Sequence, residues 1–194
     1  MRSQVVQLTD LHLLADPAEL RRGVPTRETL RDVLELVRAR QPDFDLAVFS
    51  GDLAHDERLE TYRILRELLA DWVPRCRFLP GNHDDRRFLR SAFPEVVQGG
   101  RGPIGFASDL AEWRILGLDT HVPGEIRGRI EDEQLDWLEA DLAAHAARPT
   151  LFFMHHPPIS VNSAWLDRLG LDNAEQFEQL VLSAPQIRII CAGH

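Results

Sequence analysis

The sequence has few of the features that mark secreted, membrane or nucleic-acid-binding proteins. Its 194 residues include only two cysteines, Cys76 and Cys191, which we expect to be small buried hydrophobic residues. Two such cysteines do not support a disulfide framework. No apolar stretch approaches the length of a membrane span, and the N-terminus has no signal-peptide core. The net charge of −9 argues against a nucleic-acid surface built on bulk electrostatics. We therefore expect a cytoplasmic protein that binds neither membranes nor nucleic acid.

The chain also lacks several common catalytic and organisational signatures. It contains no glycine-rich phosphate loop, and no serine, cysteine or threonine stands in a setting typical of a nucleophile. No internal repeat, low-complexity tract or interdomain linker interrupts it. We therefore expect residues 1–194 to form a single domain, and any hydrolysis to use water as the nucleophile.

The pattern of apolar residues predicts alternating strands and helices. Hydrophobic residues make up 44% of the chain and charged residues 27%, as in soluble globular proteins. Short apolar runs predict strands at about 5–8, 46–49, 76–79, 113–118, 150–154 and 187–191, with a short edge hairpin near 104–107. Helical spacing predicts helices at about 26–39, 57–72, 86–92, 131–145 and 174–182. This order predicts an α/β fold with a largely parallel sheet.

Side chains that can bind metal ions follow five of the predicted strands. They are Asp10 and His12, Asp52, Asn82, His155 and His194. In open α/β sheets, sites form beyond the carboxyl ends of the strands. We therefore expect all five sets to meet along one edge. Taken singly, each short motif is also compatible with an ordinary polar turn.

The donor types predict a two-metal site. Asp10 and His12 are two residues apart, so an extended segment would direct both side chains to the same side. Asp52 follows Gly51, where the chain can bend, and its carboxylate can bridge two ions. Mixed Asp, Asn and His donors suit Mn, Fe, Zn or Co better than Ca or Mg. Two ions about 3.5–4 Å apart can activate a bridging hydroxide for attack on phosphorus, which predicts phosphoester hydrolysis.

These motifs resemble those of the calcineurin-like metallophosphoesterase superfamily. They are D-x-H at 10–12, GD at 51–52, GNHD at 81–84, HHPP at 155–158 and a final GH at 193–194. The segment LDTHVPGEIRG at 118–128 is similar, more narrowly, to class III cyclic-nucleotide phosphodiesterases. The resemblance implies two sheets packed face to face with helices outside, a dinuclear site, and hydrolysis of phosphodiesters or phosphomonoesters.

The resemblance also implies individual roles. Asp10 and His12 would hold the first ion, Asp52 would bridge, and the second ion would be held by Asn82, His155 and His194. His83 would contact phosphate and protonate the leaving alkoxide as a general acid, and Asp84 would orient His83 or a ligand. His121 and His156 would be structural or would face the substrate. Arg21, Arg22 and Arg101 would meet a nucleotide or remain solvated.

The sequence departs from the family pattern at its end. These proteins normally carry GHxH followed by further strands, whereas this chain ends at His194. We therefore expect a C-terminally truncated domain that holds its first ion poorly and has low activity. The leading function is a metal-dependent phosphodiesterase acting on a 3′,5′-cyclic nucleotide such as cAMP. The alternatives are a broad-specificity phosphoesterase acting on other small-molecule phosphodiesters or on phosphomonoesters such as nucleotide and sugar phosphates, and a non-catalytic scaffold. The oligomeric state, a homodimer included, stays open.

Overall fold

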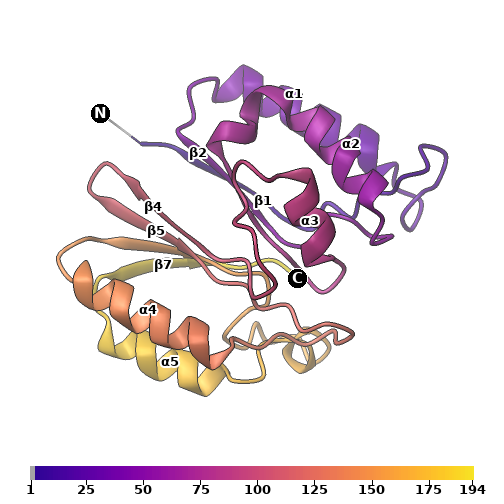
Figure 1. Ribbon diagram of the computed structural model, residues 1–194. Coiled ribbons are helices and arrows are strands. Elements are labelled where there is room, and N and C mark those ends of the chain that lie inside the picture. Colours follow the sequence, from indigo (N-terminus) through magenta and orange to yellow (C-terminus); the bar gives the residue numbers. More distant parts are fainter. Residues whose placement is uncertain (1–2) are drawn as a thin grey trace.

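Two β-sheets pack face to face, with helices on both outer sides (Figure 1). A computed structural model describes residues 3–194. The first sheet is parallel, in the order β1 (Val5–Leu8), β2 (Leu46–Ser50) and β3 (Cys76–Leu79). The second has the order β4 (Phe106–Leu110), β5 (Trp113–Gly117), β6 (Thr150–Phe153) and β7 (Ile187–Cys191), and only the β4–β5 pair is antiparallel. The α/β class and the two-sheet arrangement implied by the resemblance are both confirmed.

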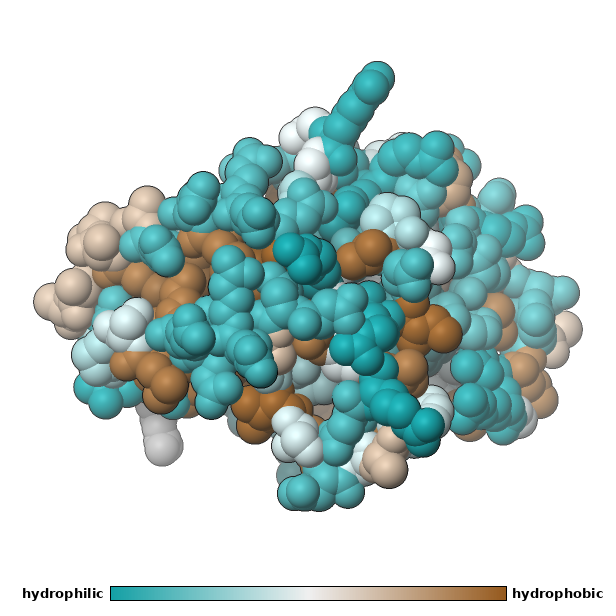
Figure 2. Space-filling view, turned by 90° about the horizontal axis from the view of Figure 1, so that it is seen from below, coloured by the Kyte–Doolittle hydropathy of each residue, from teal (hydrophilic) through white to brown (hydrophobic). Residues whose placement is uncertain are grey.

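Each sheet has its own helical layer (Figure 1). Helices α1 (Thr26–Arg40), α2 (Leu59–Leu69) and α3 (Arg86–Ala92) lie over the first sheet. Helices α4 (Asp132–Ala144) and α5 (Ala174–Ser183) lie over the second. Seen from below, the outer face of the molecule is largely hydrophilic, with hydrophobic side chains in separate patches (Figure 2). None of the helices within residues 3–194 is long and apolar enough to cross a membrane.

Strand β2 shows why two sheets form. All five of its residues are buried. Successive side chains point to opposite faces of the strand, so both faces must be covered. Ala47 and Phe49 join the core under the helices, whereas Leu46 and Val48 join the cluster between the two sheets. A strand covered on both faces has a continuous apolar sequence rather than an alternating one.

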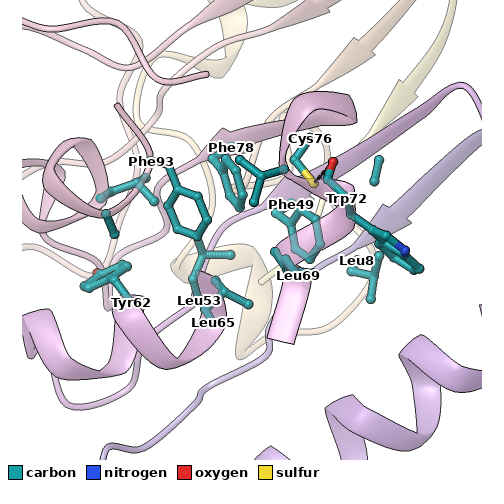
Figure 3. Close-up of a cluster of buried hydrophobic side chains, with 14 of the residues drawn as sticks. Leu8, Phe49, Leu53, Tyr62, Leu65, Leu69, Trp72, Cys76, Phe78 and Phe93 are labelled. Atoms are coloured by element: carbon teal, nitrogen blue, oxygen red, sulfur yellow. Dashed lines mark hydrogen bonds between the residues drawn. The ribbon is translucent and has the colours of Figure 1, made fainter. Parts of the chain in front are cut away.

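The core under α2 is rich in aromatic rings (Figure 3). Phe78 stacks on Phe49, with ring centroids 5.1 Å apart, and on Phe93, with centroids 4.1 Å apart. Cys76 is buried there and its thiol contacts the Trp72 carbonyl oxygen at 3.2 Å. Cys191 is half-buried and also free, so the expected absence of a disulfide holds for both cysteines.

Two predicted elements have different bounds in the structure. The helix expected at 57–72 ends at Leu69 and continues as a 3₁₀ turn, η1 (Ala70–Arg75). Pro74, which cannot continue an α-helical hydrogen-bond pattern, lies in this turn. The hairpin expected near 104–107 is longer, because β4 pairs with β5 from Phe106 to Leu110.

Candidate metal centre

The carboxyl ends of strands from both sheets meet at one place. Asp10, His12, Asp52 and Asn82 follow strands of the first sheet, and His155 and His194 follow strands of the second. The ring nitrogen Nε2 of His12 lies 3.5 Å from Asp52 Oδ2, and Nε2 of His155 lies 3.4 Å from Asp52 Oδ1. His194 Nδ1 lies 3.3 Å from His155 Nε2. The structure therefore brings Asp10, His12, Asp52, His155 and His194 together at the joint between the sheets, and Asn82 lies in the loop beside Asp52.

Asp52 stands at the centre of this group. Its side chain is buried, and its two oxygens face imidazoles that come from different sheets. Oδ1 also accepts the backbone N–H of His83 at 3.0 Å. A carboxylate with one oxygen toward each of two donor groups has the arrangement required of a bridging ligand.

The backbone at four candidate ligands is left-handed. The φ angles are 56° at Asp10, 43° at His12, 52° at Asp52 and 77° at His194. A non-glycine residue in this region costs about 1–3 kcal/mol, and such residues concentrate at functional sites. The extended geometry predicted for the Asp10–His12 pair is therefore wrong: β1 ends at Leu8, and the pair enters the site through a turn.

Backbone hydrogen bonds hold this turn in place. The N–H of Asp10 donates to the carbonyl of Gly51 at 3.0 Å, and the N–H of His12 donates to that of Asp52 at 2.8 Å. The N–H of His194 contacts the Asp10 carboxylate oxygens at 3.1 and 3.2 Å. The Asp10–His12 segment is thus fixed to the Asp52 segment through the main chain, and to His194 through the Asp10 carboxylate.

The GNHD segment needs its glycine because the chain passes close to Asp52. A Cβ atom at Gly81 would stand 2.2 Å from Asp52 Oδ1 and 2.4 Å from the Asp52 backbone nitrogen. Real Cβ atoms do not approach other atoms so closely, so a side chain at this position would displace the carboxylate.

We expect Gly81→Ala to lower the affinity for metal ions by at least about tenfold, the size of effect that misplaced ligands produce. Calorimetric titration of the metal-free protein would measure it, and circular dichroism would verify the fold. Gly99→Ala is the matched control, because a Cβ there meets nothing within 4 Å. Equal affinities in the two variants would contradict this account of the GNHD loop.

The donor atoms fit metal ions. His155 Nδ1 lies 2.9 Å from the carbonyl oxygen of Ser50, which fixes the proton on Nδ1 and leaves the Nε2 lone pair toward Asp52. Within residues 3–194, Asn82 Oδ1, His12 Nδ1 and His194 Nε2 are buried without a hydrogen-bond partner. Buried polar atoms are normally satisfied, so these unpaired donor atoms fit a metal site.

In the described part of the chain, residues 3–194, three groups of donors lie close enough to share an ion, each with its atoms within 4.8 Å of one another. They are Asp10, Asp52 and His155; His155, His156 and His194; and His12, His55 and His83. His156 is the weakest member, because its ring nitrogens already contact Thr120 Oγ1 at 2.8 Å and the Ile126 carbonyl at 2.9 Å. Burial lowers the pKa of His156 to about 2, so its imidazole is neutral.

Asp84 organises the backbone of the site. Its buried carboxylate accepts hydrogen bonds from the N–H groups of Gly81, Leu53 and Ala54 and from the hydroxyl of Tyr62, at 2.8–3.2 Å. Burial raises the pKa of Asp84 to about 6. Its hydrogen bonds go to the loops that carry Asp52 and Asn82, and its role in positioning a ligand or His83 stays a prediction.

His83 lies at the edge of a pocket of about 530 Å³. The pocket is also lined by Arg101, His121 and Ile126, so one of the predicted nucleotide-facing arginines borders it. Its wall is joined to the second sheet by Arg86, which donates to the Asp119 carboxylate at 2.6 Å and to the His121 carbonyl at 2.7 Å. A charged and partly apolar pocket beside the ligands suits a small organic phosphate.

The motifs did not include His55, which the structure places beside His12 and His83. The ring centroids of His55 and His12 are 5.2 Å apart, and those of His55 and His83 are 4.7 Å apart. Burial lowers the pKa of His55 to about 4 and also lowers that of His12. The only sequence signal was its position three residues after Asp52.

Two face-to-face sheets with Asp, Asn and His donors at their joined carboxyl ends define a metal-dependent hydrolase. Residues 3–194 match the calcineurin-like phosphoesterase family. The chain belongs to that family, and the predicted enzyme class, a metal-dependent hydrolase of phosphoric esters, is confirmed.

Curated relatives are similar along the whole chain. The 3′,5′-cyclic adenosine monophosphate phosphodiesterase CpdA of Escherichia coli K12 is 36% identical over 193 residues, which are 100% of this chain and 69% of that protein. A 3′,5′-cyclic-nucleotide phosphodiesterase of Nostoc is 32% identical, over 98% of this chain and 70% of that protein. The glycerophosphodiester phosphodiesterase GpdQ of Enterobacter lignolyticus is 30% identical, over 98% of this chain and 69% of that protein.

Among solved structures, a purple acid phosphatase from yellow lupin aligns with a TM-score of 0.70. It is 13% identical and covers 99% of this chain and 37% of that protein, so the likeness concerns the fold alone.

Proposed function

We propose that this protein hydrolyses 3′,5′-cyclic nucleotides such as cAMP at a dinuclear metal centre. The observation that carries the proposal is Asp52, a buried carboxylate with one oxygen toward His12 and the other toward His155. The similarity to relatives named as cyclic-nucleotide phosphodiesterases supports the substrate class.

Six residues would hold the two ions. Asp10 and His12 would hold the first, Asn82, His155 and His194 the second, and Asp52 would bridge. The donor set suits Mn, Fe, Zn or Co. When bound, the ions supply positive charge that polarises the phosphoryl oxygens and makes water more acidic.

His83 would transfer the proton to the leaving oxygen. Its backbone is held by the N–H bond to Asp52 Oδ1, and its ring lies half-buried at the pocket that would receive the substrate. Imidazole is the side chain most often used for proton transfer in enzymes. Asp84 would hold the loops of Asp52 and Asn82 in position through hydrogen bonds to their N–H groups and would not itself touch the substrate.

The pocket would bind the nucleoside part. Its volume of about 530 Å³ lies within the range of small-molecule sites, and Ile126 offers an exposed apolar surface while Arg101 offers positive charge. Arg86 would position this wall, because its guanidinium joins α3 to the segment after β5.

A broad-specificity phosphoesterase is the second candidate, and the 30% identity to a glycerophosphodiester phosphodiesterase favours it. Metal ligands alone do not select a leaving group, so the two candidates share one centre. A non-catalytic scaffold is disfavoured, because the sequence retains all six candidate ligands and His83.

Turnover of a substrate panel tests the proposal. The Mn²⁺-loaded protein would be assayed with cAMP, cGMP, glycerophosphodiesters and bis-p-nitrophenyl phosphate. We expect kcat/KM for cAMP to exceed that for glycerophosphodiesters by at least about tenfold, equivalent to about 1.4 kcal/mol of selective transition-state binding. The reverse ranking would favour the second candidate, and no turnover of any diester would refute both.

The weak binding of the first ion stays a prediction.

A further inference from the structure

His55 is held beside His12 by main-chain pairing. The N–H of Leu13 donates to the carbonyl of Leu53 at 3.0 Å, and the N–H of His55 donates to that of Leu13 at 2.8 Å. Leu13 and Ala54 form a parallel bridge between these two hydrogen bonds. The segment that carries His55 is therefore joined directly to the segment that carries His12.

The next residue anchors the same segment from the other side. The Asp56 carboxylate accepts the N–H of Ala15 at 2.8 Å and the Thr61 hydroxyl at 2.6 Å. The backbone before His55 and the residue after it are thus both held by hydrogen bonds, so His55 lies in a well-anchored segment.

His12, His55 and His83 form a cluster of imidazoles, and two of these rings have nitrogen atoms without hydrogen bonds. Within residues 3–194, Nδ1 of His12 and Nδ1 of His55 are both buried and have no hydrogen-bond partner. One nitrogen from each of His12, His55 and His83 lies within 4.8 Å of the other two. A divalent transition ion binds imidazole nitrogens at about 2.0–2.1 Å, so ligand atoms of one site lie within a few ångströms of each other.

We propose that His55 is a further ligand of the ion held by Asp10 and His12. The assignment rests on the proposed metal centre and extends it, because it gives that ion two imidazoles in addition to the carboxylates of Asp10 and Asp52. Each added imidazole favours Zn, Co, Fe or Mn over Mg and Ca, which prefer oxygen ligands.

A competing role for His55 is a hydrogen bond to the substrate phosphate. The charge of Arg21 is close enough to lower the pKa of His55. Within residues 3–194, the Nε atom of Arg21 is also buried and has no hydrogen-bond partner. Arginine is a donor only, so an oxyanion would satisfy it and a metal ion would not. The two roles differ in what the His55 side chain changes: metal affinity in one case and KM in the other.

Titration of the metal-free protein with Co²⁺ distinguishes them. Binding would be followed by calorimetry and by the visible absorption of the bound ion, which reports its ligands. The variants are His55→Ala and His55→Gln, and the matched control is His145→Ala, since His145 follows α4 and contacts Asp141 away from the site.

We expect the wild type and His145→Ala to bind two ions with the same spectrum. In both His55 variants, one ion should bind at least tenfold more weakly with a changed absorption band, while the other ion keeps its affinity. Unchanged metal affinities and spectra in the His55 variants would overturn the assignment. If KM for the substrate were raised in those same variants, His55 would instead bind the substrate phosphate. Absence of any bound ion in the wild type would instead refute the metal centre itself.

Discussion

Replacement of His83 by alanine should lower kcat for cAMP by about 10²–10⁴-fold, the usual contribution of a general acid. The loss should depend on the leaving group. An alkoxide must be protonated as it departs, whereas a nitrophenolate is stable without a proton. We therefore expect a much smaller loss, within about tenfold, for bis-p-nitrophenyl phosphate, measured in the same steady-state assay.

The control for this variant is its metal content. His83 contacts the site through its backbone N–H to Asp52, and alanine keeps that hydrogen bond. Two ions should therefore remain bound to His83→Ala. An equal loss for both substrates with full metal content would show that His83 acts on something other than the leaving group.

Replacement of Asp52 by asparagine should abolish metal-dependent turnover. An amide carries no charge and offers one oxygen, so it cannot face both His12 and His155 as the carboxylate does. Partners that only orient metal ligands cost 10–100-fold when removed. We expect the loss of a bridging ligand to exceed about 100-fold in metal affinity and in kcat/KM.

Thermal unfolding separates this effect from misfolding. A ligand at 100 times its Kd stabilises a folded protein by about 2.7 kcal/mol, so Mn²⁺ should raise the Tm of the wild type. Asp52→Asn should lose that rise while its metal-free Tm stays equal or higher, because a buried carboxylate is costly to desolvate. A metal-free Tm well below that of the wild type would indicate a structural role for Asp52 instead.

The strand ends were the part of this molecule that its sequence predicted best. Short apolar runs located all three strands of the first sheet, and the polar residues after them are brought together as expected. The division into two sheets could not be derived from periodicity. Phe49 and Val48 are both buried, one under helices and the other between sheets, and an apolar run does not distinguish these two environments.

The local backbone and the role of His55 were beyond the sequence for a different reason. The left-handed conformations of Asp10, His12 and Asp52 depend on hydrogen bonds between segments about 40 residues apart. His55 comes next to His12 only because Leu13 pairs with Ala54. Both features are tertiary, and nothing within a short window of sequence indicates them.

Ions bound at the joint between the sheets would also hold the two halves of the molecule together. The first half of the chain has its own hydrophobic core under α1 and α2, the second half has another against α4 and α5, and a smaller cluster of side chains lies between the sheets. An ion shared by Asp52 and His155 would cross-link these two cores at the carboxyl ends of their strands. Removal of the ions would uncouple two folding units as well as stop the chemistry, so chelation would loosen cooperativity throughout the domain.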